Sequence, residues 1–514
     1  MTAVGCVEVG PSGTTSADVL AVARHDAGVR LTEEAFDAMT RGRAAVERLA
    51  ASSDPAYGIS TGFGALALRH VPPELREKLQ VSLIRSHAAG MGPPVEREVV
   101  RALMFLRLKT MASGHTGVRP ALAEAIASML NAGITPVVPE FGSLGCSGDL
   151  APLAHCALVV MGEGRAVVGG RELSGAQALA DAGIDPIRLS AKEGLALING
   201  TDGMLGMLLM AIDDLGVLCR LADVTAAMSV EALLGTDQVF RPELHAPLRP
   251  HPGQAASADN IARLLAGSAI VASHRTGDVR VQDAYSCRCA PQVAGAVRDT
   301  LDHAAAVATR ELAAAIDNPV VLDNGEVTSN GNFHGAPLGY VCDFLAIAVA
   351  DLGSMAERRT DRLLDRTRSH GLPPFLAADP GVDSGLMIAQ YTQAAMVSEN
   401  KRLAAPASVD SIPSSAMQED HVSMGWNAAR KLRRAIDNLR RILVVELVTA
   451  ARALELRAPL APAPATAGVV AVLRQSVPGP GPDRAVAPEL AAAEASVRSG
   501  AILEAAAASA GPLR

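Results

Sequence analysis

A long helical pattern runs over residues 426–458, which contain neither Gly nor Pro. At 1.5 Å per residue, a helix over this segment is about 50 Å long. Residues 338–366 show a similar pattern that only Gly339 and Gly353 interrupt. Such helices bury their apolar stripes best against one another, so we expect a mainly α fold, a bundle of long parallel or antiparallel helices, in an oligomer. The stripe of the first segment has 4-3-4 spacing between basic positions, as in an amphipathic helix: Leu432, Ile436, Leu439 and Leu443.

The first two hundred residues have a different pattern, in which short helical segments alternate with glycine-rich loops. The segment RAVVGGRELSG (165–175) predicts a short strand pair around a Gly-Gly turn. This part of the chain is therefore expected to form a smaller, loop-rich region beside the bundle. Its main glycine-rich loops are YGISTGFG (57–64), GMGPP (90–94) and FGSLGCSGDL (141–150).

The C-terminal part of the chain is rich in proline and then in alanine. The segment PLAPAPATAG (459–468) predicts the end of the bundle, and an Ala-rich helix over 488–508 is expected to close the chain. We therefore divide the chain into an N-terminal region (1–200), a central long-helix bundle (201–480) and a C-terminal helical tail (481–514).

The composition is that of a globular protein, with 49% apolar and 19% charged residues among 514. The net charge is −8 and there is no basic run, which argues against a nucleic-acid partner. The N-terminus has no basic region leading into an apolar core, so no secretory signal is expected. Asp213 and Asp214 interrupt the apolar stretch around them before it reaches membrane-spanning length, so we expect no membrane segment.

Cysteine usage bears on the compartment and on metal binding. Seven cysteines without framework spacing suggest a reducing compartment, so we expect a cytoplasmic protein. Cys287 and Cys289 form a C-x-C pair, but no second pair lies at ligand spacing, and we expect no metal site.

The segment FGSLGCSGDLAPLAH (141–155) places three glycines around a single serine. It lacks the G-x-S-x-G spacing of a nucleophile elbow and the lysine of a phosphate loop. A plain turn that leads into a helix cap at Asp149 remains open. A chemical interpretation is also open, because Gly148 has no Cβ and its amide nitrogen can approach the carbonyl carbon of Cys146. Cyclisation with loss of two waters, the second taking the Ser147 hydroxyl, leaves a ring with an electrophilic exocyclic methylidene.

The same segment resembles the histidine and aromatic amino-acid ammonia-lyases, whose 4-methylidene-imidazol-5-one cofactor forms from Ala-Ser-Gly. Here Cys146 stands in place of the alanine, and the ring uses only the backbone of that residue. The resemblance implies a cofactor made from Cys146, Ser147 and Gly148, without a metal. It covers nearly the whole chain through YGISTGFG (57–64), SHAAGMG (86–92), EGLALINGT (193–201), QDAYSCRCAPQ (282–292), DNP (317–319), GNFHG (331–335) and SENK…PASVDSIPSSAMQEDHVSM (398–424).

The resemblance also implies roles for single residues. Tyr57 matches the base that removes the substrate β-proton, although a phenol that titrates near pH 10 needs a site favouring the phenolate. Arg288 matches the arginine that clamps the substrate carboxylate through its two-pronged donor geometry. Glu419 is an alternative main base. Further matches position the ring or the substrate, or pack near the ring: Asn199, Gln282, Tyr285 and Phe333.

Two positions indicate the substrate. Relatives that take phenylalanine or tyrosine carry other residues in place of Ser86 and His87, and tend to have glutamine in place of Glu419. A polar His87 and an acidic Glu419 suit an imidazole, which can both donate and accept hydrogen bonds. We therefore expect conversion of L-histidine to trans-urocanate and ammonia, the first step of histidine degradation.

The alternatives left open are an aromatic ammonia-lyase or aminomutase on the same scaffold, and a non-catalytic helical scaffold. The presence of Tyr57, Ser147 and Arg288 disfavours the second. The chain departs from the commonest histidine-specific pattern only at positions without an assigned role: Asp202, Ala405 and Met417. The resemblance further implies a homotetramer in which each active site draws on three subunits.

Overall fold

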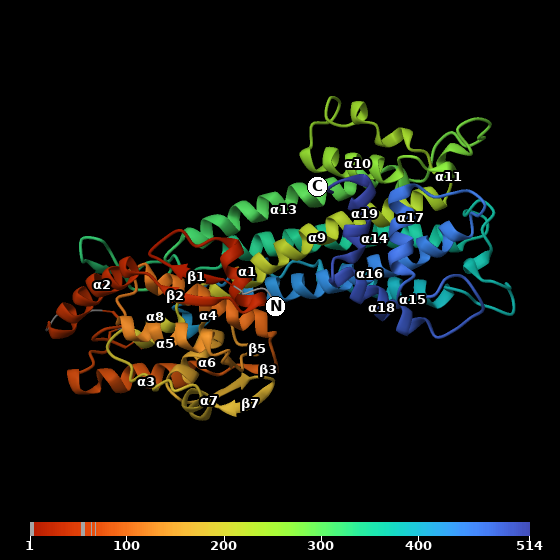
Figure 1. Ribbon diagram of the computed structural model, residues 1–514. Helices are drawn as coiled ribbons and strands as arrows, with labels where there is room; N and C mark the ends of the chain where they lie inside the picture. The colour runs from red at the N-terminus through yellow and green to blue at the C-terminus, as the bar shows by residue number, and fades with distance from the viewer. Residues whose placement is uncertain (1–4, 53–56, 63, 67) are drawn as a thin grey trace. The chain divides into compact units, whose positions relative to one another are not determined.

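The computed structural model describes residues 5–52, 57–62, 64–66 and 68–514. The first four residues and Phe63 of the YGISTGFG segment therefore lie outside the described part. The fold is mainly α, as the sequence predicts (Figure 1). The chain divides into two compact units, each built from separate stretches: unit 1 comprises 1–210, 305–343 and 406–430, and unit 2 comprises 211–304, 344–405 and 431–514. The expected boundaries near 200 and 480 stay a prediction.

Unit 1 contains short helices and small sheets. Its sheets pair β1 with β2 in parallel, and β3 with β5, β4 with β6, β6 with β7 and β8 with β9 antiparallel. Its helices are α1 (Ser16–His25), α2 (Glu33–Ala51), α3 (Arg76–His87), α4 (Arg97–Ala112), α5 (Pro120–Asn131), α6 (Leu150–Val160), α7 (Gly175–Asp181) and α8 (Glu193–Ile198). Its strands are β1 (Cys6–Val9), β2 (Gly28–Leu31), β3 (Met91–Pro94), β4 (Thr135–Pro136), β5 (Pro139–Phe141), β6 (Arg165–Val168), β7 (Arg171–Ser174), β8 (Val320–Val321) and β9 (Val327–Thr328).

All unit boundaries except the one between 405 and 406 fall within long helices: α9 (Asp202–Ala232), α13 (Ala290–Ala313), α14 (Ala336–Leu364) and α16 (Gly425–Glu455). The remaining helices belong to unit 2: α10 (Pro252–Leu265), α11 (Ala269–Ala272), α12 (Tyr285–Arg288), α15 (Met387–Leu403), α17 (Pro464–Leu473), α18 (Val486–Arg498) and α19 (Ala501–Ala510). Short 3₁₀ turns are η1 (Gly64–Leu66), η2 (Pro73–Leu75), η3 (Gln238–Phe240), η4 (Pro242–Leu244), η5 (Pro374–Leu376) and η6 (Ser415–Met417).

The periodic segments form the elements that their patterns predict. The 426–458 pattern becomes α16, the 338–366 pattern becomes α14, and the predicted strand pair becomes β6 and β7 around Gly169 and Gly170. The prediction of a single C-terminal helix over 488–508 is wrong. The chain breaks there at Gly500, whose φ of 86° is left-handed, into α18 and α19. The Pro-rich segment after α16 also starts a helix, because Pro464 occupies the first turn of α17.

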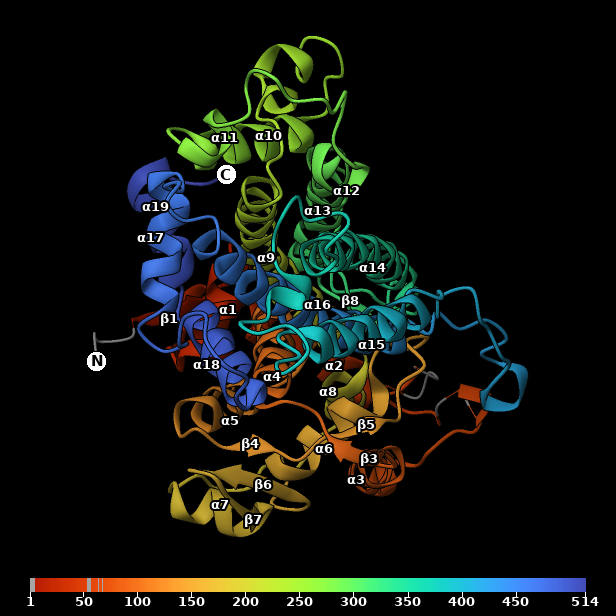
Figure 2. The ribbon, with the colours of Figure 1, turned by 90° about the vertical axis from the view of Figure 1, so that its right-hand side faces the viewer.

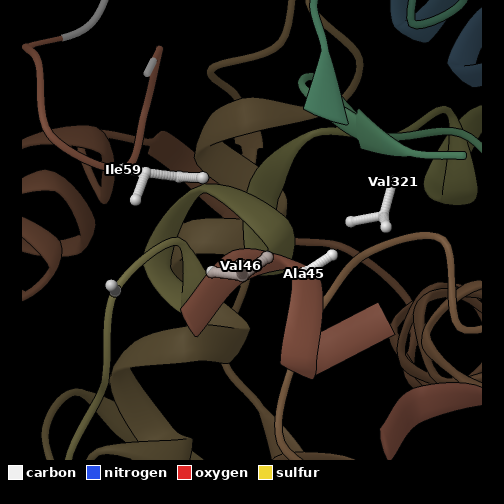
Figure 3. Packing of buried hydrophobic residues seen from close by; sticks show 5 residues of the cluster. Ala45, Val46, Ile59 and Val321 are labelled. Atoms are coloured by element: carbon white, nitrogen blue, oxygen red, sulfur yellow. The ribbon is translucent and has the colours of Figure 1, made fainter. Parts of the chain in front are cut away.

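A buried cluster in unit 1 anchors the chain near Tyr57 (Figure 3). Ile59, with no exposed surface, packs with Ala45 and Val46 of α2 and with Val321 of β8. The cluster joins segments that are far apart in the sequence, and it holds the chain two residues beyond Tyr57. Burial of such side chains stabilises the fold by about 1.5–3 kcal/mol for each large aliphatic residue.

Unit 2 is held by helix packing and by a buried ion pair. Helices α17 and α19 lie side by side (Figure 2). Arg359 of α14 donates to both oxygens of Glu446 in α16, and both side chains are almost fully buried. Helix α14 is long and apolar enough to cross a membrane by length and composition, but 61% of its most apolar window is buried inside the protein. Such burial is typical of a core helix.

Candidate active site

A cavity of about 430 Å³ in unit 1 brings together five of the predicted site residues. They come from the glycine-rich loops and from two segments late in the chain. The cavity is therefore assembled by the fold rather than by any single motif. The predicted residues that line it are Tyr57, Cys146, Ser147, Phe333 and Glu419; the other lining residues are Gly64, Asn318, Ser329, Asn330, His334, Gln418, Asp420 and His421.

The loop that carries Ser147 is fixed by hydrogen bonds from both late segments. The carbonyl of Gly145 accepts from the amide of Gly335 at 2.8 Å and from the Ser423 hydroxyl at 2.7 Å. The amide of Met424 donates to the carbonyl of Leu144 at 2.9 Å. These bonds hold the loop at the two residues that immediately precede Cys146.

Glycine is required at position 148 by a close backbone approach. Gly148 has a φ of 77°, and a Cβ there would lie 2.2 Å from the carbonyl oxygen of Gly200. The next residue, Asp149, donates its amide to that same oxygen at 2.8 Å. The side-chain oxygen of neighbouring Asn199 is buried and has no hydrogen-bond partner among the residues that the structure describes. The tight cradle and the unsatisfied amide oxygen fit a tripeptide that cyclises here.

Asp149 caps a helix other than the one it precedes. Helix α6 begins at Leu150 with Asp149 at its N-cap position, but the Asp149 side chain makes no capping hydrogen bond to α6. The Asp149 carboxylate instead accepts from the amides of Gly203 and Met204, at 2.9 and 3.0 Å, in the first turn of α9. Complete burial raises the pKa of this carboxyl to about 7, although the amide donors favour its charged form.

Glu419 accepts hydrogen bonds from two side chains of the tripeptide. Its Oε1 accepts from the Ser147 hydroxyl at 3.0 Å. Its Oε2 accepts from the Ser414 hydroxyl at 2.9 Å and from the Cys146 thiol at 3.4 Å. Burial, followed by the charge of Glu419, raises the pKa of the Cys146 thiol to about 11, so this thiol stays protonated at neutral pH.

Tyr57 presents its hydroxyl to the same cavity. The amide of Gly64 donates to the Tyr57 oxygen at 3.2 Å. A donor aimed at a phenol oxygen stabilises negative charge on that oxygen, as a base at this position requires.

His87 and Asn199 lie near this site but do not line the cavity. His87 ends α3, and its Nδ1 lies 2.9 Å from the carbonyl oxygen of Leu83. Because a carbonyl can only accept, Nδ1 carries the proton and Nε2 remains an acceptor. Burial lowers the pKa of His87, against the opposing effects of the Leu83 carbonyl and the Glu419 charge.

The remaining predicted residues belong to unit 2. Gln282 and Arg288 line a cavity of about 690 Å³ there, and neither lines the cavity that holds Ser147. The guanidinium of Arg288 lies 4.6 Å over the ring of Tyr285, a cation–π contact, and its Nε donates to the carbonyl of Asp283. Tyr285 is 69% exposed. Within unit 2 the structure therefore gathers these residues on one surface.

An amide-rich wall completes the Ser147 cavity, and no role was assigned to it from the sequence. The Asn318 side-chain oxygen accepts from the Ser329 hydroxyl at 2.8 Å and from the Asn330 amide at 3.0 Å. Just before it, the buried Asp317 pairs with the buried Lys192. The sequence signal that could have pointed to this wall was the pair of motifs DNP (317–319) and GNFHG (331–335), which lie in the wall or next to it.

The chain matches the family model of aromatic amino acid lyases over residues 14–475. It belongs to this family. It is 67% identical over 510 residues to a histidine ammonia-lyase of Streptomyces coelicolor, with 99% of each chain covered. It is 50% identical to a histidine ammonia-lyase of Gloeobacter violaceus, with 96% of each covered. A tyrosine aminomutase from Streptomyces globisporus superposes with a TM-score of 0.93 at 39% identity, covering 99% of this chain and 100% of that one. A histidine ammonia-lyase from Trypanosoma cruzi gives 0.89 at 37% identity, covering 98% and 95%.

The site of this aromatic amino acid lyase also holds two histidines without a role assigned from the sequence. The rings of His334 and His421 stack with centroids 5.5 Å apart and planes 6° from parallel. Nδ1 of His421 lies 3.1 Å from the Ser411 hydroxyl. The described residues contain no group of three or more His, Cys, Asp or Glu side chains that could hold a metal ion.

Proposed function

We propose that this enzyme eliminates ammonia from L-histidine to give trans-urocanate, as the first step of histidine degradation in the cytoplasm. The observation that carries the proposal is the single cavity in which Ser147, Tyr57 and Glu419 meet. The 67% identity to histidine ammonia-lyases over nearly the whole chain supports histidine as the substrate. Neither a nucleic-acid nor a membrane partner is part of the proposal.

We further propose that Cys146, Ser147 and Gly148 form 4-methylidene-imidazol-5-one without a metal. Two observations support this assignment: the left-handed Gly148 lies against Gly200, and the side-chain oxygen of Asn199 has no partner within the described part of the chain. Once formed, the ring supplies an electrophile that makes the substrate amine a better leaving group.

The side chains around the tripeptide have separate tasks in this proposal. The Tyr57 oxygen, as the phenolate, accepts the β-proton and becomes a neutral hydroxyl, and the Gly64 amide stabilises the phenolate before the transfer. The Glu419 carboxylate accepts a hydrogen bond from a substrate N–H, and Phe333 packs against the bound ring. Asn199 and Gln282 orient the cofactor and substrate.

Arg288 binds the substrate carboxylate as a two-pronged donor, with Tyr285 beside it. Because Arg288 and Tyr285 belong to unit 2 and do not line the Ser147 cavity, we propose that they act in the site of a neighbouring subunit. The assembly is then a homotetramer in which each site draws on three chains.

A tyrosine or phenylalanine aminomutase is the second candidate, because a tyrosine aminomutase superposes with a TM-score of 0.93. His87 and Glu419 favour histidine over a phenyl substrate, since a phenyl ring has no N–H or lone pair to pair with them. A panel of L-histidine, L-tyrosine and L-phenylalanine separates the two candidates. Urocanate absorbance with histidine supports the first, and a β-amino acid from tyrosine or phenylalanine, resolved by chromatography, supports the second.

The Ser147→Ala variant tests the chemistry of the proposal. Without the hydroxyl the second dehydration has no leaving group, so turnover should be abolished while fold and assembly are kept. Mass spectrometry of the wild type should find the peptide containing Ser147 lighter by two waters, and the variant should lack this loss. An unmodified peptide from fully active wild-type enzyme would contradict the self-made electrophile.

A further inference from the structure

The two oxygens of Glu419 have different partners. Oε1 accepts a hydrogen bond from Ser147 at 3.0 Å, whereas Oε2 accepts from Ser414 at 2.9 Å and from Cys146 at 3.4 Å. Ser414 lies in the same turn as Glu419, and the two residues also exchange backbone hydrogen bonds. Of these three donors, Ser147 and Cys146 lie in the tripeptide loop. The Ser147 side chain becomes part of the proposed ring, whereas the Cys146 side chain stays outside it.

We propose that the Cys146 thiol is a positioning residue, which with Ser414 holds Oε2 of Glu419 and so directs Oε1 toward the substrate. This inference rests on the proposed function. When the cofactor forms, the Ser147 hydroxyl is lost, and it is the only donor to Oε1 among the described residues. The two donors to Oε2, Cys146 and Ser414, remain. Oε1 is then the acceptor left for a substrate N–H.

The surroundings of Cys146 suit this role. Its side chain is 6% exposed and packs with the buried residues Val422 and Met424, which follow Glu419 in the chain. The thiol thus makes an apolar contact on one side and donates to a carboxylate on the other, two properties that cysteine combines. An alanine at this position would leave the backbone available for cyclisation but would donate nothing to Glu419.

The kinetic test compares Cys146→Ala with Cys146→Ser. If the thiol positions Glu419, Cys146→Ala should raise KM for histidine by about threefold to tenfold, the effect of one net hydrogen bond, with a smaller change in kcat. Cys146→Ser keeps a donor and should restore most of the affinity. Cys156→Ala removes another buried thiol of unit 1 and is the matched control, expected to leave KM unchanged.

Equal defects in Cys146→Ala and Cys146→Ser would overturn the proposal, because the volume or polarity of the side chain rather than its donor would then matter. An unchanged KM in Cys146→Ala would overturn it as well.

A second test examines the Cys146–Glu419 contact without turnover, in the Ser147→Ala protein, which cannot form the methylidene. Labelling of Cys146 by methyl methanethiosulfonate is followed by peptide mass spectrometry as a function of pH. Adding Glu419→Gln removes the charge that opposes the thiolate, so the labelling midpoint should fall by about one pH unit. Exposed Cys6 is the internal control and should label identically in both proteins.

An unchanged midpoint for Cys146 would show that Glu419 does not act on the thiol, and the positioning role would fall. If the wild-type enzyme fails to turn over histidine, while adding Glu419→Gln to Ser147→Ala shifts the Cys146 midpoint as expected, the proposed function is contradicted and the Cys146–Glu419 pairing stays in place.

Discussion

His87 and Glu419 both present hydrogen-bond acceptors. The Leu83 carbonyl holds the proton of His87 on Nδ1, which leaves Nε2 as the accepting nitrogen. Glu419 presents a carboxylate whose Oε2 is already held. The imidazole N–H of a histidine substrate supplies a donor to one of these acceptors, whereas a phenyl ring supplies none; the ammonium group is common to both kinds of substrate. In the proposed function, the preference for histidine would rest on these individual polar atoms.

Replacing these acceptors should weaken histidine selectively. We expect His87→Leu and Glu419→Gln each to reduce kcat/KM for histidine by about 1–3 kcal/mol in transition-state free energy, the cost of one unpaired polar group. Inhibition by an analogue that carries only the carboxylate should change far less, and its inhibition constant is the control. A double variant that turns over histidine at the wild-type rate would show that neither residue contacts the imidazole.

His87 should also make stability depend on pH. Burial lowers its pKa in the folded protein below the ordinary 6.5, so the unfolded chain binds a proton first as the pH falls. The contribution of neutral His87 is thus fully present above pH 6.5 and is lost as the pH falls through the lowered folded value. In urea unfolding, the wild type should lose more stability between pH 7.5 and pH 5 than His87→Asn. Parallel losses in the two proteins would rule out this contribution.

At the scale of elements, the cavity wall depends on a buried ion pair between two loops. Lys192 stands immediately before α8 and donates to Asp317 and to the carbonyl of Thr116. Asp317 in turn accepts from the amide of Asn318, and its carbonyl accepts from the Asn330 side chain. Burial lowers the pKa of Lys192, while the charge of Asp317 opposes that effect. Through these bonds the ion pair fixes the backbone of the cavity wall, independently of the substrate.

Breaking this pair on one side should be costly. Lys192→Met leaves the Asp317 carboxylate buried without its counter-charge and should reduce the free energy of unfolding by about 3–5 kcal/mol. Adding Asp317→Asn removes the isolated charge and should recover a large part of that loss. Denaturant unfolding of the two variants measures the difference. If the double variant is as unstable as the single one, packing rather than charge accounts for the loss.

The elements that the sequence predicts well are those with local causes. Helix α16 follows from its stripe, and the β6–β7 hairpin follows from Gly169 and Gly170. The break at Gly500 was missed because one glycine costs an Ala-rich helix only about 1 kcal/mol, which tertiary packing can override in either direction. The partners of Asp149 lie 54 and 55 positions away, so no spacing rule could reveal them. For the same reason the Lys192–Asp317 pair and the stacked His334 and His421 emerge only from the fold.

At the scale of the whole molecule, the predicted site residues fall into two sets on two compact units. Ser147 and Tyr57 line a cavity of unit 1, whereas Arg288 and Gln282 line a cavity of unit 2. Tyr285 is largely exposed although its ring lies under the Arg288 guanidinium. Exposed aromatic and arginine side chains together are typical of surfaces that another chain covers. In the proposed assembly, a site shared between subunits would account for both sets.

The shared-site arrangement predicts that two inactive variants rescue each other. The Ser147→Ala variant cannot form the electrophile but has an intact Arg288. The Arg288→Ala variant has an intact tripeptide but lacks the arginine. If each site takes these residues from different chains, mixed tetramers regenerate whole sites. Random mixing should give about a quarter of sites whole, because each of the two parts is intact with a probability of one half. Co-expression with two different tags, followed by purification on both, isolates the mixed assemblies, and the homotypic tetramers are the controls. Mixed tetramers without activity would mean that every site is built within one chain, and the shared-site proposal would then be wrong.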